Sequence, residues 1–372
     1  MQRLHLFNCS NDLALAQGSK EYIAPKSVTQ MERDLAPLPW WWANEGDAVL
    51  LPQGADKRAV ENFFSQYNRD IIFITEDEGY NTLRQCAGCD FRPSPWGWSR
   101  ASAERFRRFG MPGTLLPTDR AIEIMRALSS REFAAEYVVK LLNETVLSEY
   151  KTILAGDKMR FIKSLEELQT PERTIFKSPW SSSGRGVFAA NNLDEPSIRE
   201  KLTGFITRQG GFIADKLYDK ILDFALEYYI TPDGKARFLG YSVFVAGGNG
   251  YYGHNIVAPQ DTLKELITKS GCPEELLDTL ITAHSTLLTT TLSGKYSGVV
   301  GIDMLTAREN GNIVVHPCIE INLRMNIGVL AIMVNSLTDC TDCKLVPASG
   351  CMFGAAVIKQ KLHIAPIKSR SK

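Results

Sequence analysis

The segment GVVGIDMLTARENGNIVVHPCIEINLRMNIG places acidic and amide side chains on two successive strands. It predicts a hairpin that turns at residues 309–312, with Asp303 in its first strand. Along the end of the second strand alternate Glu320, Asn322 and Arg324, and period-two geometry puts these three on one face. Carboxylate and amide oxygens suit Mg²⁺, and Arg324 remains for an anionic oxygen. We predict a metal site here, with a solvated strand face as the alternative.

A second segment, RTIFKSPWSSSGRGVF, predicts a strand that ends at Lys177, a loop, and another strand. Small residues let backbone N–H groups approach phosphate oxygens, while Lys177 and Arg185 supply positive charge. A phosphate-binding flap fits this composition, and an ordinary hairpin with a polar tip is the alternative. The loop consists of Ser181, Ser182, Ser183, Gly184, Arg185 and Gly186. It differs from a P-loop, because GxxxxGK[ST] is absent and the loop joins strand to strand.

The third segment is GFIADKLYDKILDFALEYYI, in which charged residues follow a short apolar strand. Asp215, Lys216 and Tyr218 can present backbone donors and acceptors to an adenine edge. Asp223 lies farther along, where its carboxylate could accept a hydrogen bond from a ribose hydroxyl. A charged connection between strands explains the segment equally well.

Eight cysteines raise the question of zinc or disulfides. Cys86 and Cys89 form one CxxC pair, and Cys340 and Cys343 form another, so the two pairs could together bind zinc. The pairs lie far apart in the chain and the other cysteines are scattered singly. We therefore expect reduced structural thiols.

The N-terminal part predicts a small parallel α/β lobe that ends near Pro112. Its strands are expected in RLHLFN, DAVLLPQ and DIIFITED, separated by helices such as KRAVENFFSQY. The Pro- and Gly-rich CDFRPSPWGWSR predicts an irregular connection. The adjacent tryptophans of LPWWWANEG indicate a contact between lobes rather than a base-stacking site, since no basic cluster accompanies them.

The remainder of the chain predicts helices followed by sheet. Ser129 and Glu132 have the spacing of a capping box at the head of AAEYVVKLL. From Thr174 onward, short β-rich runs separated by Gly-bearing turns predict mostly antiparallel sheet. One clear helix, PEELLDTLITAHSTLLTTTL, interrupts that sheet.

Composition excludes several classes of partner. The 372 residues carry 42 Lys plus Arg and 42 Asp plus Glu, so no overall positive field exists to attract nucleic acid or anionic lipid. The opening residues lack the apolar stretch of a signal peptide, and no window has the apolar length of a membrane span. We expect a soluble, cytoplasmic protein of two or three lobes with neither nucleic acid nor membrane as a partner.

In order, the three chemical segments resemble the ATP-grasp superfamily over roughly Ser129 to Gly328. The most specific match is IEINLRMNIG, which looks like that superfamily's E-x-N-x-R ending. The resemblance implies an α/β and α+β protein, in which two α+β lobes clasp the nucleotide after a small parallel α/β pre-grasp lobe. The implied domains are residues 1–112 (pre-grasp lobe), 113–215 (small lobe with the flap) and 216–372 (large lobe with the metal site).

The resemblance also implies roles for individual residues. Lys177 would contact the α- and β-phosphates of ATP, and residues 182–186 would form the flap. Lys216 and Tyr218, after Asp215, would offer backbone to adenine, and Asp223 would contact ribose. One or two Mg²⁺ ions would be held by Asp303, Glu320 and Asn322, with Arg324 steadying the reacting phosphate. Where many members carry a phosphate-side lysine, this chain has Arg131, unless Lys158 takes that role.

The family reaction is an ATP-dependent ligation. A carboxylate attacks the γ-phosphate of ATP, and an amine or thiol then displaces phosphate from the acyl phosphate. Small-molecule substrates are therefore the implied partners, and a homodimer is compatible with the sequence. We place the acceptor near Asn8, Asn11 and Asp12, with His254 and Asn255 as further candidates for substrate contact. A small-molecule kinase and a non-catalytic nucleotide-binding module are the alternatives.

Overall fold

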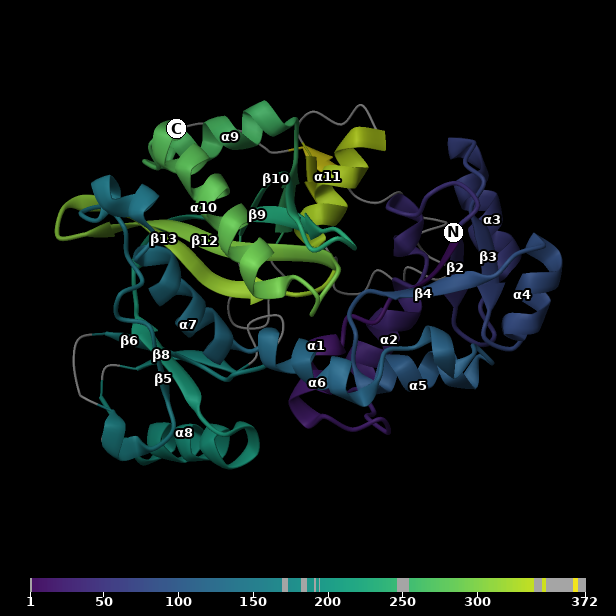
Figure 1. Cartoon of the computed structure of the whole chain (residues 1–372), viewed down its shortest axis with the longest axis horizontal. Helices are drawn as coiled ribbons and strands as arrows, with labels where there is room; N and C mark the ends of the chain where they lie inside the picture. The colour runs from purple at the N-terminus through teal and green to yellow at the C-terminus, as the bar shows by residue number, and fades with distance from the viewer. Residues whose placement is uncertain are drawn as a thin grey trace. The chain divides into compact units, whose positions relative to one another are not determined.

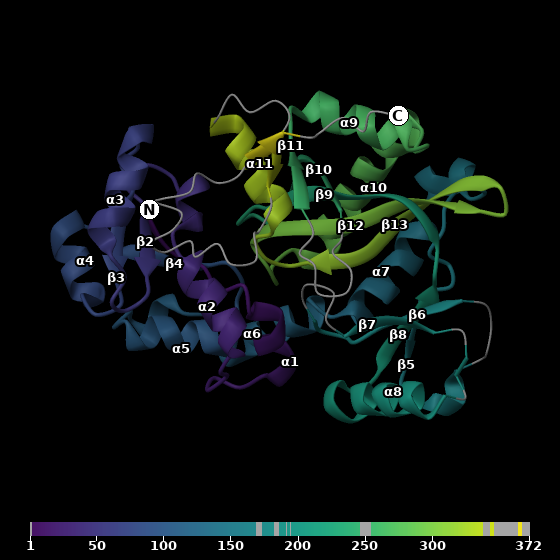
Figure 2. The same cartoon turned by 180° about the vertical axis from the view of Figure 1, so that it is seen from behind.

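The computed structural model describes residues 2–168, 173–181, 186–190, 192–193, 195–245, 254–337, 343–345 and 364–366. The chain forms two compact units, the first made of Met1–Glu123 with Met333–Lys372 and the second of Ile124–Ile332. Figures 1 and 2 show the elements of each unit from opposite sides. The three-domain division stays a prediction from the sequence.

A four-stranded parallel sheet of order β3-β2-β1-β4 forms the centre of the first unit. Its strands are β1 (Gln2–Leu6), β2 (Ala48–Leu51), β3 (Ile72–Thr75) and β4 (Phe91–Pro95). The predicted parallel α/β lobe is thus confirmed, with its first three strands where the sequence indicated them. The irregular connection predicted over CDFRPSPWGWSR was wrong in part, because β4 lies within it. An edge strand such as β4 tolerates proline, which lacks the N–H for a ladder hydrogen bond.

Helices surround this sheet, and one of its faces packs an apolar core that includes Leu4, Leu6 and Phe106. They are α1 (Asn11–Gln17), α2 (Lys26–Asp34), α3 (Lys57–Phe64), α4 (Gly79–Ala87), α5 (Arg100–Arg108), α6 (Asp119–Leu128) and the short 3-10 helices η1 (Leu38–Trp41), η2 (Ser65–Tyr67) and η3 (Gly113–Leu115). Trp40 and Trp41 are buried within the unit, and the Trp40 ring stacks on Phe64 with 4.5 Å between centroids. These two tryptophans thus pack in the unit's own core, and the contact between lobes expected of the tryptophan run stays a prediction.

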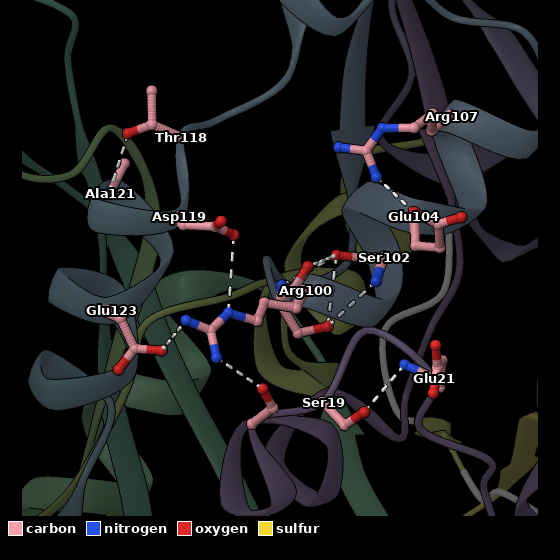
Figure 3. A network of polar contacts seen from close by, with 12 residues as sticks. Ser19, Glu21, Arg100, Ser102, Glu104, Arg107, Thr118, Asp119, Ala121 and Glu123 are labelled. Carbon is pink, nitrogen blue, oxygen red and sulfur yellow. Dashed lines mark hydrogen bonds and ion pairs between the residues drawn. The ribbon is translucent and has the colours of Figure 1, made fainter.

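Arg100 joins three segments of the first unit (Figure 3). Its Nη1 donates to the carbonyl oxygen of Gly18, 2.9 Å away, at the end of α1. The same guanidinium forms ion pairs with Asp119 at 3.6 Å and Glu123 at 3.0 Å, both on α6. These contacts hold α1, α5 and α6 together, and we assign the network a structural role.

The second unit begins with helices and a small antiparallel sheet of order β5-β8-β6-β7. The elements are α7 (Arg131–Leu142), η4 (Thr145–Tyr150), β5 (Arg160–Ile162), η5 (Leu165–Glu167), β6 (Thr174–Lys177), β7 (Val187–Ala190), α8 (Pro196–Gln209) and β8 (Phe212–Lys216). Ile198 and Leu202 of α8 pack against Phe176 and Phe212, so α8 covers one face of this sheet (Figure 1).

A larger antiparallel sheet follows, in which β13, β12, β9, β10 and β11 are successive neighbours. The elements are β9 (Asp219–Ile230), β10 (Ala236–Val245), β11 (His254–Val257), α9 (Gln260–Lys269), α10 (Glu274–Leu292), β12 (Gly298–Glu309), β13 (Asn312–Asn322) and α11 (Ile327–Leu337). Two short strands, β14 (Cys343–Leu345) and β15 (Ile364–Pro366), pair antiparallel with each other. The antiparallel character predicted for the chain after Thr174 is confirmed.

One face of the larger sheet is apolar. Leu226 of β9 and Ile302 of β12 lie in one buried cluster with Leu280 and Leu288 of α10, so α10 covers that face. Residues that alternate with them, such as Asp303, belong to the other face. The candidate site occupies this second face.

Two predictions about helices need correction. Besides α10, the β-rich part contains α8, α9 and α11, although only one clear helix was expected. The signals for α8 were present, because it begins at Pro196 and Gly210 follows its last residue, a pairing typical of helix termini. The N-terminal cap of α7 is Ser130 and not Ser129 as predicted. The Oγ of Ser130 accepts from the N–H of Phe133 at 3.1 Å, whereas the Oγ of Ser129 donates to the carbonyl oxygen of Met125.

In the described part of the chain, no helix combines the length and apolarity needed to cross a membrane.

Candidate functional site

Asp303, Glu320 and Asn322 lie together on the polar face of the larger sheet. In the β12–β13 hairpin, Asp303 pairs with Glu320, and Gly301 pairs with Asn322. The hairpin turns at Asn310 and Gly311, both with positive φ, as a two-residue Asn-Gly loop requires. The structure therefore brings the three predicted metal ligands to adjacent positions.

Three carboxyl groups influence one another at this face. Burial raises the pKa of Asp303 well above its ordinary value, and the neighbouring Glu320 and Glu227 raise it further. The described residues contain no group of three or more His, Cys, Asp or Glu side chains that could hold a metal. A cation here would thus rely on two carboxylates, the Asn322 amide, and oxygens of phosphate and water. That donor set fits Mg²⁺.

Arg324 follows directly on the same strand end. Its Nη2 donates to Oδ1 of Asn322 at 2.9 Å, and its Nη1 donates to the carbonyl oxygen of Met325 at 3.2 Å. The guanidinium also opposes the rise in the pKa of Asp303. Arg324 therefore lies beside the predicted ligands, but β13 ends at Asn322 and Arg324 lies two residues beyond the strand.

Arg131, at the start of α7, connects this face to the small sheet. Its Nη2 donates to both carboxylate oxygens of Glu320, at 2.8 and 2.9 Å. Its Nη1 donates to the carbonyl oxygen of Ser178 and to Oγ of Ser181, each at 2.7 Å. Lys158, the other predicted phosphate-side cation, is exposed and pairs with Asp157 at 3.2 Å. Of the two, only Arg131 contacts a predicted metal ligand.

Lys177 ends β6 and is buried beside Asp215 of β8. Its Nζ lies 3.8 Å from Oδ2 of Asp215, and Nε2 of His316 lies 3.4 Å from the same oxygen. Burial lowers the pKa of Lys177, and the negative charge of Asp215 counteracts only part of that effect. Burial raises the pKa of Asp215, but contacts with His316 and Lys177 outweigh it and leave the pKa below its ordinary value. His316 was not predicted, although a lone histidine within VVHPCI could have signalled it.

The segment predicted for adenine and ribose is held by local contacts. The N–H of Lys216 donates to Oδ1 of Asp215 at 2.8 Å, and Lys216 Nζ contacts Glu309. Tyr218 Oη accepts from the N–H of Gly156 at 3.3 Å. Asp223 pairs with Lys220. The nucleotide roles of Lys216, Tyr218 and Asp223 stay predictions.

Glu227 is a buried carboxyl group that the sequence did not single out. It lies on β9 opposite Gly301, and therefore on the same face of the larger sheet as Asp303. Asn326 Nδ2 donates to its Oε2 at 2.7 Å, and Ser242 Oγ donates to its Oε1 at 2.9 Å. Burial raises the pKa of Glu227 to about 7. A charged residue inside the apolar run FALEYYI was the available signal.

The predicted flap lies mostly outside the described residues, which omit Ser182, Ser183, Gly184 and Arg185. Gly186 is described, with φ +70°, and its carbonyl oxygen accepts from the N–H of Ser178 at 2.9 Å. A Cβ at Gly186 would lie 2.4 Å from Ser178 Oγ, so this position needs glycine.

The residues predicted for the acceptor are only partly described. In the first unit, Asn8 donates to the carbonyl oxygen of Gly97 at 2.9 Å, and Asn11 is buried. Asn255 pairs with Phe244 in the β10–β11 ladder. The side chain of His254 and the loop before it lie outside the described residues. Substrate contact by any of these residues stays a prediction.

No protein-family model matches the sequence, and no curated protein matches it. Several solved structures are similar to this chain. N5-carboxyaminoimidazole synthetase from Staphylococcus aureus is 14% identical, with a TM-score of 0.42 over 88% of this chain and 72% of that one. Biotin carboxylase from Campylobacter jejuni is 13% identical, with a TM-score of 0.49 over 95% and 73%. L-amino acid ligase from Bacillus licheniformis is 13% identical, with a TM-score of 0.44 over 99% and 78%. Likeness at this level does not transfer an activity, which has to be inferred from the chain's own residues.

Proposed function

We propose that this chain is an ATP- and Mg²⁺-dependent ligase of the ATP-grasp type, which joins a carboxylate to an amine or thiol and releases ADP and phosphate. The observation that carries the proposal is the pairing of Asp303 with Glu320 next to three cationic side chains. Arg131 contacts Glu320, Arg324 contacts Asn322, and buried Lys177 interacts electrostatically with Glu320. Acids for a metal beside cations for phosphates are what MgATP requires.

In the proposed reaction, the substrate carboxylate attacks the γ-phosphorus of ATP and the bond to the ADP oxygen breaks. The amine or thiol then attacks the acyl carbon, and phosphate leaves. Lys177 binds the α- and β-phosphates, and Arg324 holds the phosphoryl group in transfer. Mg²⁺, held by Asp303, Glu320 and Asn322, would supply neutralising charge at the phosphoryl oxygens. Positioning and charge neutralisation suffice for this chemistry, so no protein nucleophile is needed.

The connectivity of the site supports this assignment over a P-loop enzyme. Lys177 ends a strand of an antiparallel sheet, and the loop after it leads to another strand, β7. In a P-loop the lysine instead belongs to the loop that opens a helix. The order of Lys177, Asp215 and the β12–β13 acids along the chain is also the order found in the ATP-grasp superfamily it resembles.

The test is a screen of the protein with ATP and Mg²⁺ against pools of carboxylates, amines and thiols. The expected result is ADP and phosphate released together, with a new amide or thioester seen by mass spectrometry. A phosphorylated acceptor without release of phosphate would identify a kinase instead. The variant Asp303→Asn should lose turnover. ATP binding that never leads to substrate-dependent ADP release would favour a non-catalytic module.

A further inference from the structure

Arg131 forms an ion pair with Glu320, a carboxylate that is proposed to bind the metal. One guanidinium nitrogen reaches both oxygens of Glu320, at 2.8 and 2.9 Å. The Arg131 side chain is 6% exposed and that of Glu320 is 25% exposed, so water screens the ion pair only in part. A cation that binds Glu320 therefore has to displace this guanidinium or share the carboxylate with it, against repulsion between the two positive charges.

The same guanidinium is also tied to the base of the predicted flap. It donates to Ser178 and Ser181, and the backbone N–H of Arg131 donates to the carbonyl oxygen of Pro179 at 2.9 Å. Among the described residues, its Nε finds no hydrogen-bond partner although it is buried. Arg131 thus lies between the segment that would meet phosphate and the carboxylate that would meet metal.

Arginine suits this position in a way that lysine would not. Its planar guanidinium carries several donors and pairs well with either a carboxylate or a phosphate. A nucleotide phosphate would offer Arg131 an alternative anion, and transfer of the guanidinium to that phosphate would free both oxygens of Glu320. Without such an anion, Arg131 stays bound to Glu320. A cation then competes with Arg131 for Glu320, but not for Asp303 or Asn322.

We propose that Arg131 makes divalent-cation binding at Glu320 conditional on the nucleotide. The inference rests on the proposed function, because it takes Glu320 as a metal ligand. Cation alone binds weakly, nucleotide and cation bind cooperatively, and the coupling runs through the exchange of Arg131 between Glu320 and phosphate. By linkage, the nucleotide strengthens cation binding by the same factor as the cation strengthens nucleotide binding.

The experiment measures Mn²⁺ binding to the full chain by electron paramagnetic resonance, with and without ADP. Wild type is expected to bind Mn²⁺ alone weakly, and ADP should tighten that binding by roughly 5- to 150-fold, the usual range of such coupling. In Arg131→Met, Mn²⁺ alone should bind about tenfold or more tightly than in wild type, and the effect of ADP should shrink.

Two further variants separate the specific contact from charge in general. Arg131→Lys keeps the positive charge but loses the planar fork, so it should still bind Mn²⁺ alone more tightly than wild type. Lys177→Met removes a neighbouring positive charge without freeing Glu320, so it should raise Mn²⁺ affinity less than Arg131→Met. An increase in Lys177→Met equal to that in Arg131→Met, or no increase in either Arg131 variant, would overturn the inference.

Glu320→Gln distinguishes failure of this inference from failure of the proposed function. If Glu320→Gln weakens Mn²⁺–ADP binding while both Arg131 variants behave like wild type, Glu320 is a ligand and Arg131 does not control it. If Glu320→Gln leaves Mn²⁺ binding unchanged with and without ADP, the metal assignment itself fails. The melting temperature of each variant shows whether it is folded. If Arg131→Met does not fold, Arg131→Lys is used for the test in its place.

Discussion

Replacing Glu227 by glutamine should change how the stability of the protein depends on pH. Glu227 is buried, and its pKa lies at about 7 instead of 4.5, chiefly because burial disfavours the charged carboxylate. The native state therefore holds a proton between about pH 4.5 and 7 that the unfolded state has released. When the native state binds more protons, the free energy of unfolding falls as pH rises.

The size of this effect follows from the two pKa values. A difference between 4.5 and about 7 corresponds to roughly 3 kcal/mol of unfolding free energy. That stability is present below about pH 4.5, is lost progressively up to about pH 7, and does not change further above pH 7.5. Glu227→Gln cannot ionise, so the difference in unfolding free energy between variant and wild type should shift in favour of the variant by roughly 3 kcal/mol across this window.

The assay is urea denaturation of both proteins at several pH values from 5 to 8, without metal or nucleotide. Taking the difference between the two proteins removes most of the contribution of other titrating groups. Glu265→Gln, which removes an exposed carboxylate, is the matched control and should differ from wild type by less than about 0.5 kcal/mol at every pH. A difference for Glu227→Gln that is constant from pH 5 to 8 would refute a buried carboxyl group with a raised pKa.

Three further predictions concern the site and the cysteines. Lys177→Ala should weaken ATP and ADP binding by tenfold or more while adenosine binding stays nearly unchanged, because the nucleotide contacts that are lost are those to phosphate. Lys158→Ala, at an exposed lysine, should bind all three like wild type, and calorimetric titration measures each case. Glu320→Gln should retain the wild-type melting temperature to within a few degrees but lose most of the tightening of ATP binding by Mg²⁺; an identical response to Mg²⁺ in the two proteins would remove Glu320 from the metal site. The purified protein should hold no stoichiometric zinc, and one zinc per chain that disappears on mutating Cys86 or Cys343 would contradict this.

The sequence by itself was sufficient to place Glu320 and Asn322 on one face, because alternation along a strand is a local property of the backbone. Arg324 was expected on the same strand, but β13 ends at Asn322. The turn at Asn310 and Gly311 was also readable, since Asn-Gly favours a tight hairpin loop. Parallel and antiparallel character followed in the same way from the spacing of apolar runs and turns. These features depend on neighbouring residues, and therefore the linear order contains them.

The exact partner of Asp303 depended on the tertiary structure. Leu305 pairs with His316, so an unbroken ladder would place Asp303 opposite Cys318. An irregularity between Asp303 and Leu305 shifts the register and brings Glu320 opposite Asp303. Such a bulge is stabilised by packing around the strand pair, and local propensity does not reveal it.

The choice of Arg131 over Lys158 as the cation beside Glu320 was likewise open in the sequence. Arg131 and Glu320 are 189 positions apart, and only the packing of α7 near β13 brings them together. Glu227 became part of the site for a related reason, because the pairing of β9 with β12 puts it opposite Gly301, where the absence of a side chain leaves room for a carboxylate. Contacts between distant segments depend on how whole elements pack, and that packing is a property of the folded chain that no short stretch of sequence contains.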